Sequence, residues 1–235
     1  MLRTLAETAA RLVFPPACEA CQRPLEQEGL CDPCMSGIRF LKPPFCIGCG
    51  RTVLAKDLAC AQCALQSRGF DRAYACAVYE GTIKDALHTF KFRGRKQLAH
   101  FFSDMMLSFL RTHADLSGST CVAAVPMERF KKAQRGFNHS ELLAKKVAQG
   151  LRLPDHSDLL RRAHSQEDQH RLGKRAREQN VREAFGAARS DAFRGHHVLL
   201  IDDVMTTGET CSACARALKL AGALSVTALV CARGA

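Results

Sequence analysis

The stretch VLLIDDVMTTGET at residues 198–210 decides the fold of this chain. It begins with a continuous apolar run, which is typical of a strand buried on both faces of a sheet. Two adjacent carboxylates, Asp202 and Asp203, end that run, and a turn rich in hydroxyl groups and glycine then opens a helix. This order of strand, turn and helix predicts a βαβ unit in an α/β protein.

The turn itself has the composition of a phosphate-binding loop, with Thr206, Thr207, Gly208, Glu209 and Thr210 in succession. Backbone N–H groups at the start of a helix, with the helix dipole behind them, form an anion pocket to which hydroxyls add donors. The two carboxylates can accept from vicinal ribose hydroxyls or support a hydrated Mg²⁺. The same residues could simply cap a helix, but the combined order of apolar run, acid pair and loop favours a ligand site.

The patterns on either side extend this prediction to a parallel sheet flanked by helices. Apolar, β-rich runs predict strands over residues 72–79, 121–125, 197–202 and 224–230. Helical spacing of apolar residues predicts helices over residues 82–92, 97–113, 139–150 and 171–180, and one more from the Thr-Gly turn to Gly222. Strands and helices therefore alternate through the second part of the chain.

Eight of the thirteen cysteines lie between residues 18 and 63, in four Cys-x2-Cys pairs. Two intervening residues let both thiolates of a pair reach one tetrahedral ion at about 2.3 Å, and two pairs complete a closed shell. The pairs predict two structural zinc ions, held by Cys18, Cys21, Cys31, Cys34, Cys46, Cys49, Cys60 and Cys63. The spacing leaves open whether the pairs combine in sequence or interleave. Disulfides and an iron–sulfur cluster are the less favoured alternatives.

The cysteine content changes sharply after the fourth pair, which predicts a domain boundary. We expect residues 1–68 to form an N-terminal helix and a double zinc-ribbon or zinc-finger module, and residues 69–235 to form the α/β domain. The helix is indicated by amphipathic spacing over residues 2–13, before Pro15 and Pro16. A segment this poor in bulky apolar residues needs its metal to fold.

Composition narrows the class of protein and its compartment. Hydrophobic residues make up 47% and charged residues 24% of the chain, which excludes a chain disordered throughout. We expect no membrane span, because no apolar run approaches the roughly 18 residues that one needs. Glu7 and two arginines interrupt the N-terminal stretch where a signal peptide would be apolar. We therefore expect a cytoplasmic protein with reduced thiols.

Positive charge is concentrated in the second part of the chain. The 34 Lys and Arg against 23 Asp and Glu give a net charge of +11, and residues 71–235 carry 26 basic and 17 acidic side chains. Three basic stretches, at 91–96, 129–146 and 161–182, suit the backbone phosphates of single-stranded DNA. Phenylalanines that could stack on unpaired bases lie among them, namely Phe92, Phe130 and Phe137. Alternatively, these stretches are solvated faces and the phenylalanines belong to the core.

A fifth Cys-x2-Cys pair, Cys211 and Cys214, begins the helix after the phosphate loop. A thiolate there would be stabilised by the helix dipole, so a redox role is conceivable. We interpret both residues as small side chains that pack on the sheet.

The chain resembles the ComF family of competence-associated proteins, and the resemblance covers nearly all of it. The residues that carry it are Phe14-Pro15-Pro16, the Cys-x2-Cys-Gly at 46–50, Lys91-Phe92, Arg135-Gly136-Phe137-Asn138, Gln169-x2-Leu172, Arg177-x2-Asn180, Phe185 and the loop at 198–210. The resemblance implies a zinc module followed by a type I phosphoribosyltransferase domain. It also implies that Asp202 and Asp203 hold the ribose hydroxyls of 5-phosphoribosyl-1-pyrophosphate and that residues 206–210 hold its 5-phosphate.

Two functional hypotheses follow. In the first, the protein serves DNA uptake in natural transformation, and its phosphoribosyltransferase-like domain handles single-stranded DNA or DNA-uptake and DNA-processing proteins bound to it. In the second, the domain transfers ribose 5-phosphate to an unidentified acceptor, with Asp202, Asp203 and Mg²⁺ as the catalytic groups. Candidates for pyrophosphate or DNA contacts in either case are Lys91, Arg135, Arg171, Lys174 and Arg175.

Overall fold

The computed structural model describes residues 16–26, 29–55, 58–66, 68–112, 118–162, 185–189 and 191–234. The helix expected over residues 171–180 and the N-terminal helix expected over residues 2–13 lie outside these ranges, as do Arg171, Lys174 and Arg175. No helix in the described ranges is both long enough and apolar enough to cross a membrane.

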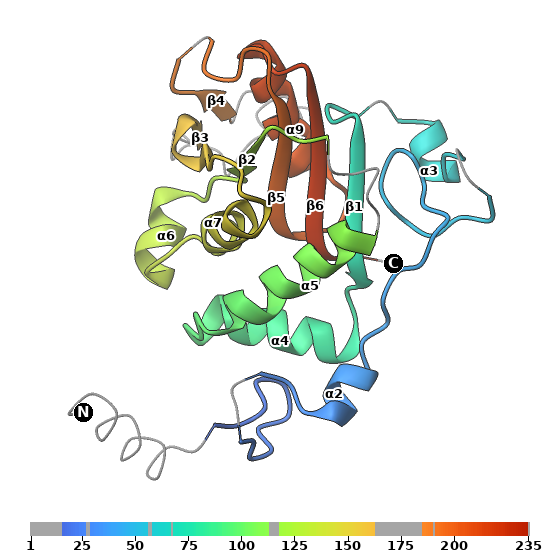
Figure 1. Ribbon diagram of the computed structural model, residues 1–235, viewed down its shortest axis with the longest axis vertical. Coiled ribbons are helices and arrows are strands. Elements are labelled where there is room, and N and C mark those ends of the chain that lie inside the picture. Colours follow the sequence, from blue (N-terminus) through green and yellow to red (C-terminus); the bar gives the residue numbers. More distant parts are fainter. Residues whose placement is uncertain are drawn as a thin grey trace, which may run out of the picture.

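A four-stranded parallel sheet forms the centre of the fold (Figure 1). Its strands are β1 (Arg72–Val78), β2 (Cys121–Ala124), β5 (His197–Met205) and β6 (Ser225–Arg233), in the order β1-β6-β5-β2. All three neighbouring pairs are parallel, so each connection must cross over through a helix. The sheet is buried on both faces, as the continuous apolar runs predict.

Helices cover both faces of this sheet. The first face carries α4 (Gly81–Phe92), α5 (Leu98–Thr112) and α7 (His139–Leu151), and the second carries α9 (Glu209–Leu220). Alternate residues of β5 divide between the two cores: Leu199 and Ile201 pack with α4, α5 and α7, whereas Val198 and Leu200 pack with α9. The predicted class, a parallel sheet flanked by helices, is confirmed.

Some elements differ from the prediction. Strand β5 continues through Asp202 and Asp203 to Met205, because its ladder with β6 continues to the pair Met205 and Arg233. Helix α6 (Arg129–Arg135) has no apolar periodicity to signal it, since its seven residues are mostly charged or polar. A two-stranded antiparallel hairpin of β3 (Leu160–Arg162) and β4 (Phe185–Ala187), preceded by the short helix η2 (Ser157–Leu159), is too brief to show a pattern.

Within its described residues, the cysteine-rich segment contains the short helices α2 (Asp32–Ser36) and α3 (Ala61–Ala64) and two cysteine clusters. The segment between the clusters runs beside β1, where Phe40 forms an antiparallel bridge with Ala77. Leu41 N donates to Cys76 O at 2.9 Å, and Val78 N donates to Arg39 O at 2.9 Å. The free edge of the sheet at β1 is therefore covered by the chain itself.

The second cysteine cluster is docked tightly against the sheet. The guanidinium of Arg233, only 3% exposed at the end of β6, donates from Nη1 to Cys49 O at 2.7 Å. Gly50 follows with a φ of +70°, and a Cβ built there would lie 2.4 Å from Ala73 O in β1. Glycine is thus required at position 50 both by its backbone conformation and by the closeness of the strand.

Replacing Gly50 by alanine should destabilise the protein by about 2–5 kcal/mol, because left-handed strain of about 1–2 kcal/mol adds to overpacking of about 1–3 kcal/mol. Gly94 is the matched control: its φ is +65°, but a Cβ there meets nothing within 4 Å. Gly94→Ala should therefore show the strain alone. Denaturant unfolding of the two variants measures the difference, and equal losses would contradict the close approach at Gly50.

Candidate functional site

Each of the two acids at the end of β5 contacts a side chain from a different helix. Asp203 is 8% exposed, and Lys91 Nζ from the end of α4 lies 2.7 Å from its Oδ1. Asp202 Oδ1 accepts from Ser140 Oγ of α7 at 2.8 Å and from the backbone N–H of Asp203 at 2.9 Å. The acid pair that the sequence singles out is therefore a built cluster joining β5, α4 and α7.

The segment 135–138 explains how Ser140 reaches this cluster. Gly136 ends α6 with a φ of +80°, a left-handed conformation that turns the chain towards α7. Asn138 then caps α7: its Oδ1 accepts from Ser140 N at 3.1 Å, and its Nδ2 donates to Val125 O at 3.1 Å. Sequence reasoning missed Ser140, although an Asn two residues before a Ser at a helix start was the available signal.

Burial raises the pKa of Asp202 to about 7, with the negative charge of Asp203 as the second cause. The hydrogen bond from Ser140 and the charge of Lys91 act in the opposite direction without offsetting these effects. The other oxygen, Oδ2, faces the thiol of Cys211 at 3.9 Å, which is a weak donor. Asp202 therefore keeps an oxygen that can accept a strong hydrogen bond from a ligand.

The predicted loop directly follows this acid pair. Gly208 is buried with a φ of +81° and stands at the start of α9, so the turn requires glycine. Thr206, Thr207, Glu209 and Thr210 are exposed. Thr207 Oγ1 accepts from Glu209 N at 3.5 Å, and these four residues stand exposed at the N-terminal end of a twelve-residue helix, where hydroxyl groups can meet a ligand.

Residues just before the α/β domain support this loop, and the sequence analysis missed them. The guanidinium Nη1 of Arg68 donates to Thr207 O. Gly69 N donates to Ser212 Oγ at 2.7 Å in the first turn of α9, and a Cβ at Gly69 would lie 2.1 Å from Ser212 O. Arg68 and Gly69 therefore fix the chain entering the domain against the start of α9.

His139 lies under the Lys91–Asp203 pair and was also missed as a site residue. It is fully buried, and its ring contacts Phe90 at 4.9 Å and Phe137 at 4.6 Å between centroids. Burial lowers its pKa to about 4, and the positive charges of Arg135 and Lys91 act in the same direction. His139 is thus a neutral packing group at ordinary pH.

The aromatic residues proposed for stacking are not equivalent. Phe137 is 8% exposed and belongs to the core, so its expected role as an open stacking surface is wrong. Phe92 and Phe130 are 58% and 78% exposed. Arg135 lies over the ring of Phe92, with Cζ 4.6 Å from the ring centroid.

Cys211 and Cys214 lie buried in α9 against the sheet. Burial raises the pKa of both thiols, and the charge of Asp202 adds to it. This environment fits their interpretation as packing residues.

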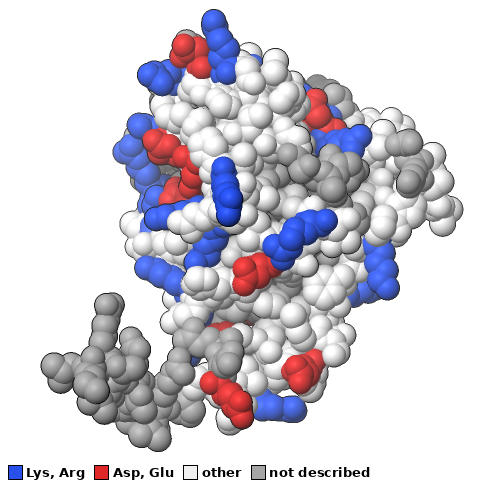
Figure 2. Space-filling model, in the orientation of Figure 1, with Lys and Arg blue, Asp and Glu red and all other residues white. Residues whose placement is uncertain are grey.

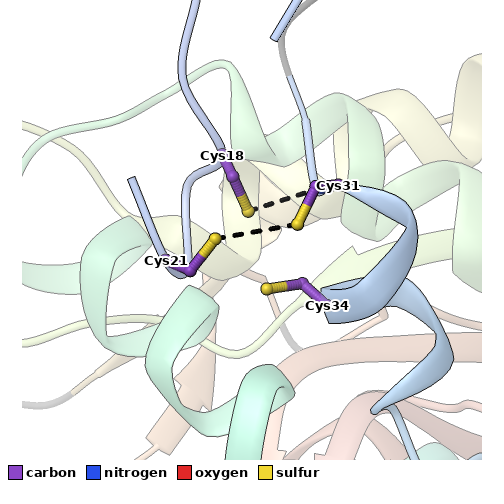
Figure 3. Close-up of side chains that lie close together, drawn as sticks. All are labelled: Cys18, Cys21, Cys31 and Cys34. Carbon is purple, nitrogen blue, oxygen red and sulfur yellow. Dashed lines mark hydrogen bonds between the residues drawn. The ribbon is translucent and has the colours of Figure 1, made fainter. Parts of the chain in front are cut away.

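The eight N-terminal cysteines form two clusters that combine the pairs in sequence. Cys18, Cys21, Cys31 and Cys34 make the first (Figure 3), and Cys46, Cys49, Cys60 and Cys63 make the second. Within each cluster all sulfurs lie within 4.8 Å of one another, and the sulfurs of Cys21 and Cys31 are 3.6 Å apart. Tetrahedral zinc with sulfur at about 2.3 Å requires about 3.8 Å between sulfurs, so the clusters fit the ion.

Backbone groups prepare both clusters for thiolate ligands. Cys31 N lies 3.4 Å from Cys18 Sγ, and Cys60 N lies 3.2 Å from Cys46 Sγ. Burial acts to raise the pKa of Cys18, but N–H groups of Cys21, Cys31 and Ala20 outweigh it, and the pKa falls to about 6. Such hydrogen bonds orient zinc ligands and favour their charged form.

Loss of the second zinc site should destabilise the protein more than loss of the first, because only the second cluster is held against the sheet by Arg233 and Gly50. A Cys18→Ser/Cys21→Ser variant and a Cys46→Ser/Cys49→Ser variant should each retain about one zinc ion of two. The second variant should lose more thermal stability. Elemental analysis with thermal unfolding tests both statements, and equal melting temperatures would contradict the asymmetry.

Asp202→Asn should stabilise the protein at pH 8. The pKa of Asp202 lies near 7 in the folded chain and near 3.9 unfolded, so its stability contribution is full below pH 4 and is lost as pH rises to 7. By linkage, removing the charge should add up to about 4 kcal/mol at pH 8 and less at pH 5. Asp203→Asn should instead destabilise, because it leaves the largely buried Lys91 without its partner. Melting curves of the two variants without Mg²⁺ measure these effects. Destabilisation in both variants would contradict the raised pKa of Asp202.

Comparison with known proteins adds to this geometry. The double zinc ribbon domain family matches residues 9–64, and the phosphoribosyl transferase domain family matches residues 138–235. The DNA utilization protein YhgH of Escherichia coli is 29% identical over 92% of this chain and 96% of its own length. Competence protein F of Haemophilus influenzae is 27% identical over 84% and 87%, and competence protein ComFC of Bacillus subtilis is 27% identical over 81% and 78%.

The double zinc ribbon match covers both cysteine clusters, which are therefore two structural zinc-ribbon sites. The phosphoribosyl transferase match includes Ser140, the acid pair and the loop. The chain thus carries a double zinc ribbon followed by a phosphoribosyltransferase domain, and it is similar along most of its length to proteins named DNA utilization protein and competence protein, which supports its resemblance to the ComF family.

Proposed function

We propose that this protein serves DNA utilization in natural transformation and that its α/β domain binds phosphoribosyl pyrophosphate with Mg²⁺. Within this proposal the zinc-ribbon module comprises residues 1–68 and the ligand-binding domain residues 69–235. The names of the relatives, DNA utilization protein and competence protein, support the biological role. The observation that carries the ligand is the acid cluster next to an exposed phosphate loop at the end of one strand.

Each part of the proposed ligand has a chemically suited group. Asp202 Oδ2, opposed only by the weak thiol donor Cys211, can accept from a ribose hydroxyl. The exposed hydroxyl residues at 206–210 and the N-terminal end of α9 suit the 5-phosphate. Lys91, whose ammonium group already lies in the cluster, can neutralise part of the pyrophosphate charge.

Oxygen donors of the acid pair also fit Mg²⁺, which prefers carboxylates together with ligand phosphates. Bound there, the ion would offset the charge of the pyrophosphate. Asp203 would then share its carboxylate between Lys91 and the ion or a ribose hydroxyl, while Ser140 keeps Asp202 oriented. The chain's own contribution is thus to position two carboxylates and to hold the phosphate.

Single-stranded DNA is the second ligand of this proposal. Figure 2 shows Lys and Arg gathered along the edge that carries α6, with some acidic residues among them. Residues 129–146 contain six Lys or Arg and one acid. Two of these cations are paired, Lys131 with Glu128 and Lys132 with Glu141. A third, Arg135, lies over the ring of Phe92, where a cation can still meet a phosphate.

Asp203→Asn should weaken Mg²⁺-dependent binding of phosphoribosyl pyrophosphate by about tenfold or more, because hydrogen bonds to a charged group contribute about 1.5–3 kcal/mol. Asp71→Asn is the matched control, since it removes a carboxylate paired with Lys219 at 2.8 Å just before β1, at the opposite end of the parallel strands. Isothermal titration calorimetry should find the control unchanged. Binding that survives in Asp203→Asn, or no binding to the wild type at millimolar ligand, would overturn the proposed site.

A further inference from the structure

A cation and two tilted aromatic rings lie together beside the acid cluster, and both rings are exposed. Phe92 is the last residue of α4 and leaves 58% of its surface open. The ring of His88, one turn earlier on the same helix, lies 4.6 Å from the ring of Phe92 between centroids. The guanidinium of Arg135, at the end of α6, lies 4.6 Å from the same ring. Three planar groups from two helices therefore gather at one place on the surface.

The arrangement is fixed by the fold. His88 and Phe92 are four residues apart, which puts them on one face of α4. Arg135 is held at its position because Gly136 ends α6 in a left-handed turn and Phe137 anchors the chain in the core.

We propose that the exposed part of Phe92, together with His88 and Arg135, is a stacking site for an unpaired base of single-stranded DNA. This inference rests on the DNA-handling part of the proposed function and names the residues that would contact a base. Aromatic rings and the planar guanidinium of arginine can stack on any base, because every base has a π-face.

The surroundings favour a nucleic-acid strand over other occupants. Arg93, Arg95 and Lys96 follow Phe92 directly in the sequence, and all three are exposed. One of them, Arg95, is 3.7 Å from Glu19, so part of the charge is already balanced. Cations next to a partly open aromatic ring match the alternation of phosphates and bases in a single strand.

These three groups also lie next to the acid cluster. Lys91, whose Nζ contacts Asp203, is the residue immediately before Phe92. A base on Phe92 would therefore bring the neighbouring phosphates of its strand to the cationic turn at 93–96. The acid pair itself stays free for its own ligand, so the two ligands have separate contacts.

The test compares two labelled strands of equal length, an oligothymidylate and an abasic strand with the same number of phosphates. The wild type should bind the oligothymidylate more tightly, because only this strand can stack. Phe92→Leu should weaken its binding by about tenfold while leaving the abasic strand unchanged. Arg135→Lys keeps the charge but removes the planar group, so it should also reduce the preference. Fluorescence anisotropy at fixed salt measures each affinity.

Phe40→Leu is the matched control. Phe40 is a similarly exposed phenylalanine, 42% accessible, whose backbone pairs with Ala77 of β1, and its replacement should change neither affinity. Melting curves verify that each variant is folded. Wild-type binding with no preference between strands, or a full preference in both Phe92→Leu and Arg135→Lys, would overturn the stacking site alone. Failure of the wild type to bind either strand would overturn the DNA-handling function with it, whereas binding of phosphoribosyl pyrophosphate is measured independently.

Discussion

Two adjacent carboxylates at the buried end of β5 are the constraint on which the site depends. Side chains alternate along a strand, so Asp203 points with Ile201 towards the face that carries α4, and Asp202 points towards α9. Two negative charges so close and so little hydrated are unfavourable without partners. Lys91 compensates one, and Ser140 with the Asp203 N–H holds the other. Consequently the end of α4 and the start of α7 must both lie within contact distance of the acid pair on β5.

This requirement gives a physical reason for sequence features that are far apart. Helix α4 ends at Phe92. Its next-to-last residue, Lys91, points inwards to Asp203, so the side chain of Phe92 points outwards. Segment 135–138 has to turn through Gly136 and cap α7 with Asn138, because that cap sets the first turn in which Ser140 lies. The outward residues Phe92 and Arg135 meet as a consequence of two inward constraints.

The parallel sheet and its main helices were predictable because burial on both faces leaves a clear apolar pattern. The loop was predictable because glycine and hydroxyl residues stand directly after a strand. Ser140 and Arg68 were not, since their contacts join segments far apart in sequence, 62 and 139 residues in the two cases. The pairing of the cysteines was equally hidden, because sequential and interleaved pairings satisfy the same spacing. Phe137 shows that neighbouring charges in the sequence do not predict exposure: it stands among cations in the sequence, but its side chain packs in the core.

The zinc ribbons are part of the same electrostatic arrangement and do more than precede the domain. A zinc ion with four thiolates carries a net charge of about −2, and the second cluster lies against the sheet. The buried Arg233 donates to Cys49 O, and its positive charge favours the thiolate form of Cys49, whose pKa burial otherwise raises. The next residue, Gly234, donates to Met205 O, directly before the phosphate loop. Arg68 holds the other side of that loop at Thr207. Residues that contact the zinc-ribbon segment or end it therefore hold the loop at 206–210 from two sides, Gly234 at Met205 and Arg68 at Thr207.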